Sequence, residues 1–150
     1  MAELGLLANL AAVIGAGVQT SIALYSLAST IGSAGRELED MGSDITLFCR
    51  VLKQVQKSLT NPTSARLSMT AIQDTQDVVT RCHAILEDIK NSLERINGGK
   101  RNSIDVVGRV KWIFKRPKIL MQRCSLQTCT TYLQLMLSTL DRASRISITK

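Results

Sequence analysis

Residues that support catalysis or a β fold are scarce in this chain. It contains one histidine, two prolines and nine glycines, and only 3% of its 150 residues are aromatic. The few prolines and glycines argue against a turn-rich all-β fold, and a single histidine leaves little acid–base chemistry near neutral pH. No phosphate-loop, serine-hydrolase or zinc-protease motif occurs in the sequence. We therefore expect a non-enzymatic all-α domain without a cofactor or a metal ion.

Closely paired cysteines are also lacking. The four cysteines, at positions 49, 82, 124 and 129, form no CxxC spacing and no paired set of zinc ligands. We interpret them as reduced core thiols of a cytoplasmic protein. His83 lies beside a predicted helix seam, so we interpret it as a boundary residue and not as a catalytic group.

Charge is missing from one segment and concentrated in another. Leu4 to Gly35 contains no charged residue, whereas Gly98 to Cys124 contains eight basic residues and one acid, a net of +7. That value equals the formal charge of the whole chain. Such a segment fits contact with anionic lipids, binding to nucleic acid or a solvated basic face. Because no nucleic-acid-binding motif accompanies it, we favour lipid contact through Lys100, Arg101, Lys115, Arg116 and Lys118.

Two segments repeat core positions at alternating spacings of three and four, and the longer part of a third continues the same seven-residue pattern, which is typical of amphipathic helices. They span residues 38–59, 65–96 and 104–140. Asn61 and Pro62 should end the first, so that the second begins near residues 62 to 65, and Asn97 to Gly99 should end the second. The third should start near Asn102 or Ser103 and should end or kink at Pro117 before a longer part follows.

The three patterns predict the buried positions. The first two comprise Leu38, Met41, Ile45, Phe48, Leu52, Val55 and Leu59, and then Ala65, Ser68, Ile72, Thr75, Val79, Cys82, Leu86, Ile89, Leu93 and Ile96. The third comprises Ile104, Val107, Trp112, Phe114, Ile119, Leu126, Cys129, Leu133, Met136 and Leu140, widened by Leu120, Leu135 and Leu137. These lengths predict an all-α, antiparallel four- to five-helix bundle with an apolar, Gly/Ala-rich N-terminal helix.

The uncharged N-terminal segment divides into two arcs on a helical wheel. The bulky arc would form a membrane-active surface made of Leu4, Leu6, Leu7, Leu10, Val13, Ile14 and Val18. The small arc would allow close helix packing and contains Gly5, Ala8, Ala12, Gly15 and Ala16. A buried helix at the centre of a soluble bundle and a conditional membrane helix both fit this pattern.

Four stretches together resemble the fungal HeLo-like N-terminal domains of STAND (NLR-like) receptors. They are residues 1–6 (MAELGL), 23–38 (ALYSLASTIGSAGREL), 44–52 (DITLFCRVL) and 112–119 (WIFKRPKI). The resemblance covers essentially the whole chain, as a single domain with an arm at residues 1–31 and bundle helices at 34–147.

The resemblance implies a cell-death-inducing helical bundle of fungal innate immunity. In such domains the N-terminal helix is thought to reach the membrane once the chains are clustered. It therefore implies a cytoplasmic effector that relocates to the plasma membrane, with anionic lipids, further copies of itself and a receptor carrying the same domain as partners. The alternative is a soluble homotypic oligomerisation or adaptor domain of a larger receptor.

Overall fold

The described residues form a bundle of four α-helices. The computed structural model describes residues 2–29, 35–60, 69–97 and 106–149. Its helices are α1 (Ala2–Ala28), α2 (Gly35–Thr60), α3 (Met69–Asn97) and α4 (Val106–Thr149), and these described ranges contain no strand. The all-α prediction is confirmed. The predicted helix starts near residues 62 to 65 and at Asn102 or Ser103 lie outside the described residues.

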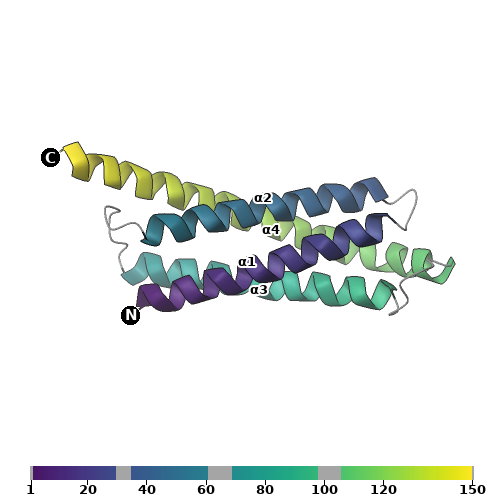
Figure 1. Cartoon of the computed structure of the whole chain (residues 1–150). Coiled ribbons are helices and arrows are strands. Elements are labelled where there is room, and N and C mark those ends of the chain that lie inside the picture. The colour runs from purple at the N-terminus through teal and green to yellow at the C-terminus, as the bar shows by residue number, and fades with distance from the viewer. Residues whose placement is uncertain (1, 30–34, 61–68, 98–105, 150) are drawn as a thin grey trace.

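Consecutive helices run in opposite directions, as Figure 1 shows. The neighbour relations are less simple, because α1 packs against both α2 and α3, and α4 packs against the same two helices from the other side. Two of these four neighbouring pairs, α1 with α3 and α2 with α4, are therefore parallel. α1 and α4 occupy opposite edges of the bundle, with α2 and α3 between them.

The heptad patterns of α2 and α3 form much of the core. In α2, all the predicted positions from Leu38 to Val55 are buried and Leu59 is half-buried. In α3, all those from Ile72 to Ile96 are buried, whereas Ala65 and Ser68 lie outside the described residues. Both helices are strongly amphipathic, so burial of one stripe against the neighbouring helices explains their positions.

α4 follows its prediction in part. Trp112, Ile119, Leu126, Cys129 and Leu133 are buried, and the helix continues through Pro117 without ending there. Leu120, Met136 and Leu137 are half-buried, and the side chains of Ile104, Val107 and Leu140 are not among those described.

The prediction of a core position is wrong for two residues of α4. Phe114 is 79% exposed and Leu135 is 65% exposed. Phe114 lies two positions after the buried Trp112, and a step of two residues turns a helix by about 200°, onto its other side. The same geometry applies to Leu135, two positions after the buried Leu133.

α1 is a core helix in this structure. Its buried positions follow a heptad pattern that runs along the side facing α2 and α3, namely Leu6, Leu10, Val13, Gly17, Thr20, Leu24 and Leu27. The one polar side chain of this inner seam is satisfied, because the Thr20 hydroxyl donates to the Ala16 carbonyl at 2.7 Å and lies 3.4 Å from the Leu86 carbonyl. A helix whose residues from Leu4 onward are all uncharged can thus pack against two neighbours at once.

Gly17 permits the close approach of α1 and α2. A Cβ atom at position 17 would lie 2.5 Å from the Cys49 sulfur and 3.8 Å from side-chain carbons of Ile45 and Leu86. A Cβ atom at Gly15 would meet nothing within 4 Å. Two glycines separated by one residue therefore have opposite surroundings.

This contrast gives a matched test of the packing. Gly17→Leu should lower the free energy of unfolding by about 1–3 kcal/mol, because the added side chain overpacks the α1–α2 contact. Gly15→Leu should leave it unchanged or raise it by up to about 1 kcal/mol, since leucine is the better helix former. Urea denaturation followed by circular dichroism measures both, and equal stabilities would contradict this packing of α1.

Candidate functional site

The solvent side of α1 is uncharged from Leu4 to Tyr25. The exposed residues Leu4, Ala8, Ala11, Gly15, Val18, Ile22 and Tyr25 repeat at spacings of four and three and lie opposite the inner seam. We call them the outer face of α1. Leu4 and Ile22 are 64% and 63% exposed. An exposed apolar stripe of this length is typical of an interaction surface, not of a solvated helix.

The predicted membrane-active residues are divided between the two sides of α1. Leu6, Leu10 and Val13 are buried in the inner seam. Leu7 and Ile14 are half-buried, and Leu4 and Val18 are on the outer face. Most of the bulky arc therefore packs against α2 and α3, because burying these side chains removes the largest apolar area from water.

Most of the predicted small-residue face is exposed. Gly5, Ala8, Ala12 and Gly15 are exposed, and only Ala16 is buried. The close contact between α1 and α2 lies at Gly17 instead, a residue outside the predicted small-residue face. Its signal was present in the spacing, since Gly17 lies four residues after Val13 and three before Thr20 on the same seam.

Polar side chains border the outer face of α1 on both sides. Toward α3, the Lys90 ammonium donates to Gln19 Oε1 at 3.0 Å and Asn9 donates to Gln76 at 3.5 Å. Toward α2, the Tyr25 hydroxyl lies 3.2 Å from the Ser43 hydroxyl. An apolar centre with a polar rim is the usual composition of a protein interface.

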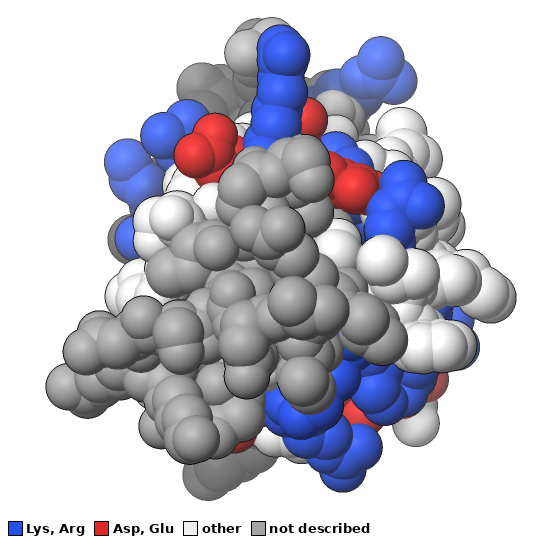
Figure 2. Space-filling model, turned by 90° about the vertical axis from the view of Figure 1, so that its right-hand side faces the viewer, with Lys and Arg blue, Asp and Glu red and all other residues white. Residues whose placement is uncertain are grey.

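The basic segment is partly neutralised by acids of other helices. Arg116 Nε lies 3.1 and 3.0 Å from the two carboxylate oxygens of Glu37, and this contact raises the pKa of Arg116. Lys118 Nζ lies 3.8 Å from Asp88, with both side chains 57% exposed, which is a weak pair. Figure 2 shows Lys and Arg side chains around this end of the bundle, with Asp and Glu beside several of them.

The five predicted lipid-contact residues therefore differ in their surroundings. Arg116 is ion-paired and Lys118 is exposed beside an acid. Lys115 is half-buried. Lys100 and Arg101 lie outside the described residues.

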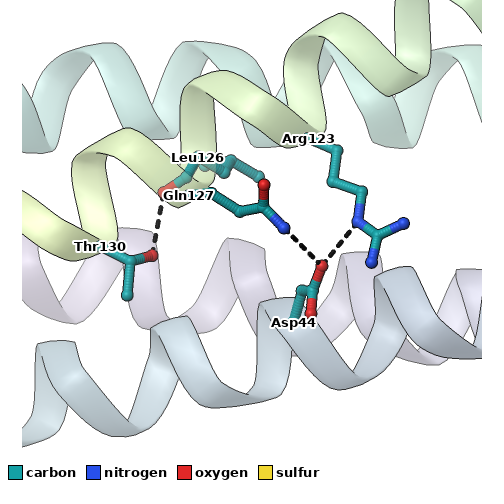
Figure 3. Close-up of polar contacts among 5 residues, drawn as sticks. All are labelled: Asp44, Arg123, Leu126, Gln127 and Thr130. Atoms are coloured by element: carbon teal, nitrogen blue, oxygen red, sulfur yellow. Dashed lines mark hydrogen bonds and ion pairs between the residues drawn. The ribbon is translucent and has the colours of Figure 1, made fainter.

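Asp44 joins α2 to α4. It accepts hydrogen bonds from Arg123 Nε at 2.6 Å and from Gln127 Nε2 at 3.2 Å, as Figure 3 shows. One turn further along α4, the Thr130 hydroxyl donates to the Leu126 carbonyl at 2.9 Å. The cavity beside this cluster measures about 20 Å³, which is room for one water molecule and no larger ligand. Asp44 is therefore a structural link.

The described residues hold no group of three or more His, Cys, Asp or Glu side chains placed to bind a metal ion. His83 is half-buried beside Asn9, Ala12 and Thr80, which agrees with its interpretation as a boundary residue.

Two thiols that are distant in the sequence meet between α3 and α4. Cys82 and Cys129 are both buried and hydrogen-bonded to each other. The pKa of Cys129 is lowered to about 7 by the hydrogen bond from Cys82 and by the charge of Arg81, although burial acts in the opposite direction. The pKa of Cys82 is raised by the same hydrogen bond and by burial. Cys129 is therefore the thiol of this pair that ionises first.

α1 is also the one described helix that is long and apolar enough to cross a membrane, over Leu4–Ala28. Of its most apolar window, 39% is buried inside the bundle, and core helices of soluble proteins meet the same criterion. Comparison of the chain with protein-family models, curated proteins and solved structures finds no match.

The thiol pair makes a prediction about pH. The thiolate absorbance of Cys129 in the folded protein should reach half its maximal change near pH 7. In the Cys82→Ala variant the donor is lost, so the pKa of Cys129 should increase and the profile should move to higher pH. Ultraviolet titration measures the thiolates, and the difference from a Cys129→Ser variant isolates the signal of Cys129. Identical profiles in the two proteins would contradict the hydrogen bond.

Proposed function

We propose that this domain is a non-enzymatic, homotypic interaction module that associates through the outer face of α1. The observation that carries the proposal is the absence of charge from an exposed helix face that runs from Leu4 to Tyr25. Its apolar side chains are available without any rearrangement of the bundle. The resemblance to HeLo-like signalling domains adds support, since clustering of chains is what that resemblance implies.

The shape of the outer face suits a second copy of the same chain. Small residues occupy its centre and larger ones lie at both ends. If a twofold axis passed beside Ala11, Ala8 of one copy would lie opposite Gly15 of the other, and Leu4 opposite Val18. From Leu4 to Val18 each large residue would then face a large residue and each small one a small one, which is the self-complementarity that an isologous dimer needs, while Ile22 and Tyr25 would lie beyond the overlap.

The size of the outer face suits a weak dimer. At 1.5 Å per residue, the overlapping stretch from Leu4 to Val18 is about 21 Å long, and a helix presents a face about 10 Å wide. Two such faces cover about 400 Å² in total, so even with their bordering side chains the contact belongs to the small interfaces of weak, transient complexes. We therefore expect a weak dimer that higher local concentration strengthens.

A pair of alanine variants tests this function. Ala11→Glu places a charge at the centre of the outer face and should weaken self-association at least tenfold, because the carboxylate would be buried without a partner. Ala84→Glu, on the exposed side of α3, makes the same chemical change elsewhere and should leave self-association unchanged. Sedimentation velocity over a concentration series measures both. A monomeric parent, or equal dissociation constants, would refute the proposal.

A cysteine at the proposed axis gives a positional test. In a Cys124→Ser background, which removes the exposed native thiol, Ala11→Cys should form an intermolecular disulfide with itself on mild oxidation. Gln73→Cys, on the exposed side of α3, serves as the control and should remain monomeric on non-reducing gels.

The second candidate is an effector that inserts α1 into a membrane, as we expect from the sequence. It is favoured by one observation, the apolar length of Leu4–Ala28. Insertion would require α1 to leave the bundle and uncover Leu6, Leu10, Val13 and Leu24. At about 1.5–3 kcal/mol for each of these side chains, release costs as much as the whole stability of a typical domain. A trigger would have to supply that energy.

A reversible tether tests this second candidate. Gly17→Cys would bring a second thiol beside Cys49 and allow a disulfide between α1 and α2. If α1 must leave the bundle, the oxidised protein should release no dye from anionic vesicles, and reduction should restore leakage. Equal leakage in both redox states would exclude release of α1 as the mechanism.

A further inference from the structure

The solvent side of α4 carries a second apolar surface, at the opposite edge of the bundle from α1. Ile113, Phe114 and Met121 are 65%, 79% and 73% exposed, and Pro117 between them is exposed as well. At about 100° per residue these four positions fall within an arc of about 100°. We call them the α4 ridge. No residue of this ridge takes part in the proposed α1 interface.

Basic side chains flank the α4 ridge. Lys111 and Lys118 lie on one side of its arc, and Arg116 lies on the other. From Val106 to Leu140 the helix contains no acidic residue. The acids that reach this helix come from α2 and α3 and engage Arg116, Lys118 and Arg123. Lys111 and Lys115 have no ion pair among the described residues.

This combination of groups limits what can cover the ridge. A second copy would bring a second set of Lys and Arg side chains against the first, and like charges repel. A nucleic acid would attract the basic groups through its phosphates, but its phosphate backbone offers no apolar surface against which exposed Ile, Phe and Met side chains could be buried. A bilayer with anionic headgroups satisfies both features, because its acyl boundary takes up the apolar ridge while its headgroups attract the flanking lysines.

We propose that the α4 ridge docks on an anionic lipid bilayer while the bundle stays intact. Phe114 and Ile113 enter the boundary between headgroups and acyl chains, and Met121 lies two turns further along the same helix at a similar depth. The lysine ammonium groups extend to the phosphates on the ends of their flexible side chains. This mode of contact leaves α1 packed, and so it differs from insertion of the N-terminal helix.

Flotation with vesicles of phosphatidylcholine and phosphatidylserine tests the docking. The full chain should float with these vesicles and much less with pure phosphatidylcholine. The variant Ile113→Gln/Phe114→Gln should bind at least tenfold more weakly, whereas Leu47→Gln, an exposed leucine of α2, should bind like the parent. Lys111→Gln/Lys118→Gln should weaken binding at low salt and have little effect at high salt. Equal binding by the ridge variant and the parent would overturn the proposal.

A fluorescent reporter tests the depth of the ridge. Phe114→Trp adds an exposed indole to the buried Trp112, which is the one native tryptophan. Its emission should shift to the blue with anionic vesicles and should be quenched by brominated acyl chains, and the parent spectrum supplies the baseline. An unchanged spectrum with bound vesicles would show that the ridge stays outside the bilayer and would overturn the proposal.

Two variants already described separate this inference from the proposed function. Ala11→Glu should bind vesicles like the parent even where it no longer self-associates. The oxidised Gly17→Cys protein, with α1 tethered to α2, should also bind like the parent. Loss of binding on tethering would assign the lipid contact to a released α1. Binding of the parent to duplex DNA and to no vesicle would assign the basic surface to nucleic acid.

Discussion

Burial of the inner seam of α1 between α2 and α3 is the constraint on which the rest of the bundle depends. α2 and α3 are not extensive neighbours of each other and are held together through α1 on one side and α4 on the other. Because α1 contains no charged residue from Leu4 to Ala28, it can contact both helices without leaving a charged group in the core. Gly17 permits the close spacing of α1 and α2, since a Cβ atom at this position would lie 2.5 Å from the Cys49 sulfur.

The parts of the fold that follow from the sequence are those where charge and apolar residues alternate with helical spacing. α2 and α3 meet this condition, and their seams were predicted residue by residue. From Leu4 to Ala28, α1 has no charged residue to mark its solvent side, and Gly17 and Thr20 interrupt the apolar seam, so the sequence does not distinguish the inner face from the outer face. In α4 the apolar side chain of Phe114 predicts burial by its type alone, whereas its angular position on the helix places it in solvent.

The candidate surfaces were predictable to a smaller extent than the core. The sequence identified α1 and the basic segment as the unusual features, but which side chains remain available depends on contacts between distant segments. Glu37 on α2 engages Arg116, and Asp44 engages Arg123, so the local excess of positive charge is smaller than the segment's own composition indicates. The Cys82–Cys129 contact also joins segments that are distant in the sequence, because only the packing of α3 on α4 brings these thiols together.

The position of α1 and α4 at opposite edges has a geometric consequence for any assembly. A twofold dimer joined through the outer faces of α1 would carry its two α4 ridges on opposite outer surfaces. A single flat bilayer could then meet only one ridge of each dimer, and the other ridge would remain free for a second lipid surface. A dimer that used both the α1 contact and the α4 ridges would therefore connect two apposed membranes and would not lie flat on one of them.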